Sequence, residues 1–224
     1  DILKKIFVSI ASFTDVHLVY TVKNMFSTAK HPERLNVCIC NQDTEEKFAK
    51  VRNELSEYNI NFIDVHESDS KGCSWARELI QKELSDEYFF MQIDSHHKFV
   101  QNWDSICETM YEQCLKISNK VVLSTYATIC DMENGFKVTH QDAPYRMYCE
   151  KFYDFPKVRY VPEVVPNWKT LSEPQKWYTI SAHFIFTVCQ WVKEVPYDPY
   201  LYFDGEEVLN GAYDKSVKFI IPPL

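Results

Sequence analysis

The sequence predicts an α/β protein with a mostly parallel sheet and helices on both faces of that sheet. Two observations carry this prediction. Short apolar runs alternate with amphipathic segments from residue 6 to about residue 125, an order typical of parallel strands connected by helices. Several of these runs end in polar residues, as strands do where a parallel sheet binds ligands. The 224 residues, 46% of them hydrophobic, suffice for one domain with a sizeable core.

The spacing of apolar residues predicts the individual elements. Val19, Val22, Phe26 and Ala29 lie on one face of a helix that begins after Asp15. The other expected helices lie at 44–58, 74–84 and 103–117, and the expected strands at 6–11, 35–40, 60–65, 88–93 and 121–125.

The later part of the chain has a weaker pattern. Residues 131–176 are rich in Pro, Tyr, Trp and charged residues without clean periodicity. We therefore expect an irregular insertion that packs on the edge of the sheet through its aromatic side chains. A strand at 177–188, a short helix at 205–212 and a last strand at 217–221 are expected after it.

The composition excludes some partners and indicates a compartment. A net charge of −8 argues against nucleic acid or an anionic membrane as the main partner, and no apolar run is long enough to span a membrane. The eight cysteines lack any Cys-x-x-Cys pair, which favours free, buried thiols. Cys38 and Cys40 would face the same side of a strand. We therefore expect a cytoplasmic protein, a leader removed from its start being the alternative.

The segment Asp94-Ser95-His96 carries the clearest chemical signal. It follows the apolar run 88–93, where a parallel sheet binds ligands. In an extended segment, Asp94 and His96 would point the same way and could reach one cation. A carboxylate and an imidazole suit Mn²⁺ or a similar ion, which would stabilise a departing nucleoside diphosphate. The alternative is an Asp that caps a turn and a His on the surface.

The start of the expected third helix could bind an anion. Gly72 permits a tight entry, Ser74 could cap the helix, and Lys71 and Arg77 lie nearby. A helix start with two cations would attract a diphosphate. The alternative is an ordinary capped helix with solvated charges.

Two further clusters contain candidate functional residues. In the first, Asp204, Glu206 and Glu207 follow Phe203 around a glycine; a carboxylate there could accept or orient an acceptor hydroxyl proton. The alternative is an acidic helix start, which the helix dipole favours. The second is Trp103-Asp104, which could form a further part of the site after His96. The alternative is an Asp that caps the helix, with the indole packed over it.

Taken together, these segments resemble a known family. In order they are Phe7-Val8-Ser9-Ile10-Ala11-Ser12, Lys71-Gly72-Cys73-Ser74-Trp75-Ala76-Arg77, Gln92-Ile93-Asp94-Ser95-His96, Phe99, Asn102-Trp103-Asp104 and Phe203-Asp204-Gly205-Glu206-Glu207. This set is similar to the GlcNAc-transferase family typified by the cytoplasmic enzyme that modifies hydroxyproline on an F-box ubiquitin-ligase adaptor. The Asp-Ser-His triplet is also similar to that of the more distant polypeptide GalNAc-transferases.

The resemblance implies a GT-A fold and transfer of a sugar, GlcNAc first, from a UDP-sugar to a hydroxyl of a protein or glycan, with retention of configuration. It implies Mn²⁺ or another divalent cation such as Mg²⁺, and a single domain whose residues 1–130 bind the nucleotide sugar and whose residues 131–224 form the acceptor side. The implied metal ligands are Asp94 and His96. The implied donor-binding residues are Ser9, Ala11, Ser12, Lys71, Arg77 and Asp94. The implied catalytic residues are Asp204, Glu206 and Glu207, with Trp103, Asp104 and Phe203 on the acceptor side.

The chain also departs from this family pattern. Relatives have a further metal-binding His after the last strand, whereas this sequence stops at Leu224; the third ligand could lie beyond that residue. His183 lies in an apolar run and is expected to be a core or pocket-lining residue rather than a replacement. Two alternatives remain: a nucleotidyltransferase, which would need a Gly-rich loop that residues 9–15 lack, and a carbohydrate-binding or scaffolding module without turnover.

Overall fold

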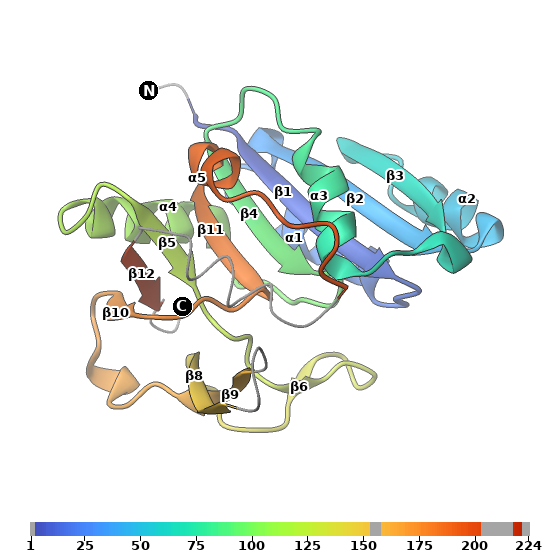
Figure 1. The fold of residues 1–224 in the computed structure, drawn as a ribbon. Coiled ribbons are helices and arrows are strands. Elements are labelled where there is room, and N and C mark those ends of the chain that lie inside the picture. Colours follow the sequence, from blue (N-terminus) through green and yellow to red (C-terminus); the bar gives the residue numbers. More distant parts are fainter. Residues whose placement is uncertain (1–2, 153–157, 203–216, 221–224) are drawn as a thin grey trace.

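The computed structural model describes residues 3–152, 158–202 and 217–220. Its centre is an eight-stranded sheet with the order β10-β12-β5-β11-β4-β1-β2-β3 (Figure 1). The strands are β1 (Ile6–Phe13), β2 (Leu35–Asp43), β3 (Ile60–His66), β4 (Phe89–Asp94), β5 (Val121–Ser124), β10 (Gln175–Trp177), β11 (Phe184–Val188) and β12 (Val217–Ile220).

Most strands of this sheet run in one direction. The strands β3, β2, β1 and β4 pair in parallel, as do β5 and β12. The strand β11 lies antiparallel between β4 and β5, and β10 is antiparallel to β12 at the edge. The predicted α/β class with a mainly parallel sheet is therefore confirmed.

The helices cover both faces of the sheet, because side chains alternate along each strand. Ile6, Val8 and Ile10 of β1 face the layer formed by α1 (Leu18–Thr28) and α4 (Trp103–Leu115). Phe7 faces the other layer, with α3 (Cys73–Gln81) and α5 (Cys189–Glu194). The remaining helix, α2 (Glu45–Glu54), packs through Val51 against the first layer.

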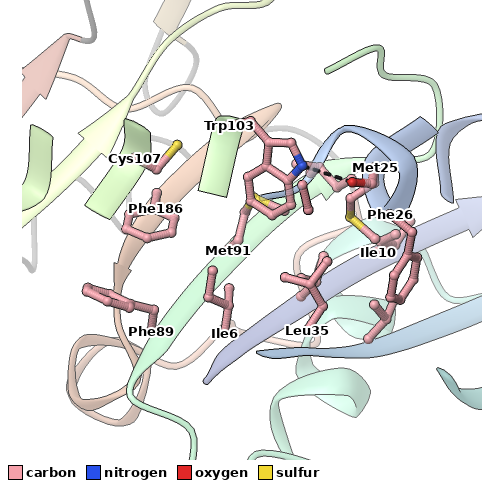
Figure 2. Close-up of a cluster of buried hydrophobic side chains, with 14 of the residues drawn as sticks. Ile6, Ile10, Met25, Phe26, Leu35, Phe89, Met91, Trp103, Cys107 and Phe186 are labelled. Atoms are coloured by element: carbon pink, nitrogen blue, oxygen red, sulfur yellow. Dashed lines mark hydrogen bonds between the residues drawn. The ribbon is translucent and has the colours of Figure 1, made fainter. Parts of the chain in front are cut away.

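Trp103 is part of the core between α1, α4 and the sheet (Figure 2). Its side chain is 2% exposed, and its indole Nε1 donates a hydrogen bond to the carbonyl oxygen of Met25 at 2.9 Å. This bond joins the start of α4 to α1. The indole thus anchors two helices, and the expectation that Trp103 lies on the acceptor side is wrong.

The second half of the chain has more regular structure than its sequence predicts. Within the expected irregular insertion, β8 (Tyr145–Phe152) and β9 (Val158–Val164) form an antiparallel pair that lies below the main sheet in Figure 1. The short strands β6 (Cys130–Asp131) and β7 (Lys137–Val138) form another. The pairing is irregular between Cys149 and Lys151, and such an irregularity disturbs the alternation on which strand prediction depends.

The strand expected at 177–188 is in fact two strands, β10 and β11, separated by residues 178–183. The helix expected at 205–212 lies outside the described residues. Within the described ranges, no helix is both long and apolar enough to cross a membrane. All eight cysteines have free thiols, and Cys38 and Cys40 lie in the same apolar cluster, as expected. Three of the eight, Cys73, Cys130 and Cys149, are only partly buried.

Candidate active site

The candidate site lies where the neighbouring strands β1 and β4 end. Ala11 of β1 pairs with Asp94, the last residue of β4, so the polar segments that follow both strands meet at the same edge. Ser95 and His96 form a bend after the strand rather than an extended continuation of it. The extended geometry expected for Asp94-Ser95-His96 is therefore wrong, and contacts with other segments orient the two candidate ligands.

Asp94 lies between two basic side chains. Oδ1 of its carboxylate is 3.1 Å from Nη2 of Arg77, and Oδ2 is 3.8 Å from Nε2 of His183. The Asp94 side chain is 24% exposed, whereas that of Arg77 is 3% exposed. Arg77 therefore holds Asp94 from inside the protein and leaves part of the carboxylate open to a ligand.

A buried polar network supports Arg77. The guanidinium also donates to the carbonyl oxygen of Ala182 at 3.4 Å and lies 5.5 Å from the ring centre of Tyr197. Gln92 donates to the same carbonyl and to the hydroxyl of Tyr197, at 3.0 and 2.8 Å. Hydrogen bonds within a buried polar network restrict the positions of the side chains that make them. Arg77 therefore holds the carboxylate of Asp94 in place. Its expected contact with the donor itself stays a prediction.

Asp15, in the loop after β1, contacts the other candidate ligand. Its Oδ2 accepts hydrogen bonds from Oγ of Ser95 and is 2.6 Å from Nδ1 of His96, and its Oδ1 accepts from the backbone N–H of His17. Burial opposes ionisation of Asp15, but the bonds from His96, Ser95 and His17 outweigh it and lower its pKa to about 2. The same bond to Asp15, followed by the charge of Asp94, raises the pKa of His96 against the opposing effect of burial.

The neighbouring His97 is a structural residue. Burial lowers its pKa to about 4, so its ring is neutral at physiological pH. Its Nδ1 is 3.2 Å from the carbonyl oxygen of Asp94, and its backbone N–H donates to the hydroxyl of Thr21. His97 thus fixes the backbone that carries Asp94 and His96.

The donor atoms at this edge suit a divalent cation of the manganese type. Asp94 offers a carboxylate and His96 an imidazole that is 40% exposed, and this mixed oxygen and nitrogen set is one that first-row ions accept. In the part of the chain that the structure describes, no three His, Cys, Asp or Glu side chains are grouped closely enough to enclose an ion. Two protein ligands leave coordination positions for the oxygens of a diphosphate.

The expected donor-binding residues lie in different environments. Ser9 is fully buried within β1, and its expected place in a nucleotide site stays a prediction. Ala11 and Ser12 lie near the end of β1. Ala11 is partly buried, whereas the Ser12 hydroxyl is buried and has no hydrogen-bond partner among the described residues. Lys71 is exposed, and its Nζ lies 5.6 Å from the ring centre of Trp75.

The start of α3 is already occupied by another segment of the chain. The N-cap is Gly72 rather than Ser74, which is buried inside the helix. The backbone N–H of Cys73 donates to the carbonyl oxygen of Tyr202 at 3.0 Å. One of the N–H groups that could bind an anion is therefore used to dock Tyr202, which weakens the case for a diphosphate at this helix start.

Asp104 belongs to the scaffold, not to an acceptor site. Its carboxylate is fully buried and accepts hydrogen bonds from the backbone N–H groups of Lys30 and His31, at 2.7 and 3.1 Å. Oδ2 also lies 3.3 Å from Nε of Arg34, which is itself buried. The acceptor-side expectation is therefore wrong, and so is the alternative in which Asp104 caps its own helix, because it binds the loop after α1 instead.

Phe203, Asp204, Glu206 and Glu207 lie outside the described residues, so their expected roles remain predictions. His183, which was expected within a strand, lies immediately before β11. Its ring centre is 4.3 Å from that of Tyr126, and its Nδ1 is 2.9 Å from Oγ of Ser181. It contacts the site through Asp94, and its expected role as a core or pocket-lining residue stays a prediction.

Solved structures of glycosyltransferases share this fold. The chain is similar to GalNAc-T7 with UDP, GalNAc and Mn²⁺ (TM-score 0.72, 13% identity, 98% of this chain and 42% of that one). It is also similar to S. aureus TarS residues 1–349 in complex with UDP-GlcNAc (0.63, 12%, 98% and 56%), and to the mannosyltransferase PcManGT from Pyrobaculum calidifontis in complex with GDP-Man and Mn²⁺ (0.55, 11%, 98% and 57%). The chain thus has the GT-A glycosyltransferase fold and spans about two fifths to three fifths of these proteins.

The family is shown by the sequence itself. The model of the glycosyltransferase (GlcNAc) family matches residues 5–48 and 43–213, nearly the whole chain. The chain therefore belongs to the GlcNAc glycosyltransferase family. No curated protein matches it.

Two residues of the site were not singled out from the sequence. Asp15 belongs to one of the polar segments that follow a strand, but nothing in its spacing indicates contact with His96. Gln92 interrupts an apolar strand, and a polar residue in such a place usually has a specific buried partner. That interruption was the available signal for the network behind Asp94.

Proposed function

We propose that this chain contains the donor-binding site of a metal-dependent glycosyltransferase that moves GlcNAc from UDP-GlcNAc to a hydroxyl of a protein or glycan, with retention of configuration. The observation that carries the proposal is the placement of Asp94 and His96 at the carboxyl end of β4 in a chain of this family. Crystal structures of proteins with the same fold contain UDP-GlcNAc, or UDP and Mn²⁺.

In this proposal Asp94 and His96 would hold the cation, Mn²⁺ or Mg²⁺, which would supply positive charge next to the departing diphosphate. The chain's own residues orient these ligands. Arg77 contacts Oδ1 of Asp94, whose side chain is 24% exposed, and His97 contacts the backbone carbonyl of Asp94. In the same proposal Ala11 and Ser12, near the end of β1, would contact the nucleoside.

The proposal assigns the acceptor hydroxyl to the region of Glu206 and Glu207. In a front-face reaction the departing phosphate takes the acceptor proton, so these carboxylates orient the hydroxyl and stabilise positive charge on the sugar rather than act as an obligatory base. Free thiols throughout the chain support a reducing, cytoplasmic location, which is part of the same proposal.

The test has two stages. Thermal unfolding is first measured with UDP and Mn²⁺, with and without chelator; stabilisation that depends on the metal and is lost in Asp94→Ala supports the donor site. Release of UDP is then measured with a panel of UDP-sugars and Mn²⁺, and UDP-GlcNAc is expected to react fastest. Stabilisation without release from any donor would support the non-catalytic module instead, and no stabilisation at all would refute the donor site.

A further inference from the structure

Asp15 uses both of its carboxylate oxygens inside the site. Oδ1 accepts the backbone N–H of His17 at 2.8 Å, while Oδ2 receives Ser95 and His96, each at 2.6 Å. The side chain is 14% exposed. Asp15 therefore clamps the Ser95-His96 bend to the start of α1 and has little capacity left to bind an ion itself.

The clamp determines which nitrogen of His96 faces the site. The two nitrogens of an imidazole lie on different edges of the ring, and an N–H at Nδ1 that donates to a carboxylate leaves the lone pair on Nε2. In metal proteins, a carboxylate behind a ligating histidine holds the ring orientation and strengthens the ligand. The contact between His96 and Asp15 is of this type, and the His96 side chain is 40% exposed.

We propose that Asp15 is a positioning residue that fixes His96 with Nε2 directed at the divalent cation shared with Asp94. This inference rests on the proposed metal-dependent function and adds a residue to it. Asp94 and Asp15 have different roles in this proposal. Asp94 is an oxygen ligand of the ion, whereas Asp15 does not bind the ion and orients the nitrogen ligand His96. In an extended segment the backbone itself would orient His96 toward the cation. Because residues 95 and 96 form a bend instead, the contact with Asp15 orients the His96 ring.

The inference predicts that Asp15 acts through His96 and not independently. Binding of Mn²⁺ is measured in the presence of UDP by the electron paramagnetic resonance signal of the free ion. Loss of a carboxylate behind a ligating histidine typically weakens metal binding about 10- to 100-fold, and we expect that range for Asp15→Asn. The double variant Asp15→Asn/His96→Ala should bind Mn²⁺ no more weakly than His96→Ala alone, because the orienting contact then has nothing to orient.

A spectroscopic readout separates orientation from general stability. In the pulsed spectrum of bound Mn²⁺, the nitrogen coupling from histidine should be present in the unmodified chain, absent in His96→Ala, and absent or reduced in Asp15→Asn. The matched control is Asp64→Asn, which loses a carboxylate of similar exposure that pairs with Arg52 through a 2.6 Å contact on β3. This control should keep both the affinity and the coupling, and folding of each variant is checked by its thermal unfolding without metal.

The outcomes distinguish the two proposals. If the unmodified chain binds no Mn²⁺ with UDP, the metal-dependent function and the role of Asp15 are both refuted. If it binds Mn²⁺ with the histidine coupling, but Asp15→Asn keeps full affinity and coupling, only the role of Asp15 is refuted. Additive losses in the double variant would also refute it, because they would show that Asp15 contributes by a route that does not involve His96.

Discussion

The guanidinium of Arg77 lies 3.1 Å from Oδ1 of Asp94, at the carboxyl end of β4. Arg77 is almost fully buried, whereas Asp94, the candidate metal ligand, is partly exposed. The ion pair therefore connects a buried cation to a carboxylate at the surface of the site. A buried arginine with fixed partners presents a rigid cation. The carboxylate is thereby held in place before any ligand arrives.

Arg77→Gln should therefore weaken both the fold and the site. Breaking a buried charge pair from one side costs about 3–5 kcal/mol, and because Asp94 is partly solvated we expect roughly 2–3 kcal/mol in the free energy of unfolding, measured in urea. The control is Arg52→Gln, whose exposed pair with Asp64 should contribute less than about 1 kcal/mol. In an Asp94→Asn background the loss from Arg77→Gln should shrink; an equal loss in both backgrounds would contradict the pairing.

Gly72→Ala should displace the backbone of Tyr202. Gly72 has a φ of +98°, and a Cβ there would lie 2.2 Å from the carbonyl oxygen of Tyr202. Gly135→Ala is a matched control, because that glycine also has a positive φ, +73°, but a Cβ would meet nothing within 4 Å. We expect a loss of about 1 kcal/mol from backbone conformation alone in the control and a clearly larger loss at Gly72, measured as the shift in unfolding midpoint. Equal shifts would show that the contact with Tyr202 is unimportant.

Asp104→Asn should destabilise the fold through the loop after α1. Asparagine keeps the size of the side chain but loses the charge that pairs with Arg34, and it can no longer accept both backbone N–H groups. The expected loss is about 3–5 kcal/mol in the free energy of unfolding. If the variant remains folded, its binding of UDP and Mn²⁺ should be unchanged. A folded variant that no longer binds UDP and Mn²⁺ would show that Asp104 does contribute to the site.

His97 should make the fold less stable in mild acid. Its pKa is about 4 in the folded chain and about 6.5 when unfolded. Between these values the unfolded chain binds a proton that the folded chain does not, so the free energy of unfolding falls as the pH falls through this window. From pH 7 to pH 5 the contribution is about 2 kcal/mol.

The measurement compares urea unfolding at pH 7 and pH 5 for the unmodified chain and His97→Asn. The amide of asparagine can replace the Nδ1 contact with the carbonyl oxygen of Asp94 but does not titrate. The comparison between chains also removes the effect of His96, whose raised pKa acts in the opposite direction. The variant should lose less stability on acidification, and an identical loss in the two chains would exclude His97 as the cause.

The positions of the first four strands and of the helices between them were predictable to within a few residues from apolar periodicity. The motif Asp94-Ser95-His96 was placed correctly at a strand end, because composition changes sharply there. The insertion of β11 between β4 and β5 was not predictable, since an antiparallel strand from late in the chain has the same local pattern as a parallel one. Trp103 and Asp104 were misjudged because side-chain type alone does not reveal burial.

The sequence by itself determined the α/β alternation, the family resemblance and the candidate ligands Asp94 and His96, because these depend on residue type and on spacing over a few residues. Only the tertiary structure decided that Arg77 and Asp15 hold those ligands in place. The two contacts join residues 17 and 81 positions apart. Such contacts depend on which strands are neighbours and in what register, which no local pattern encodes.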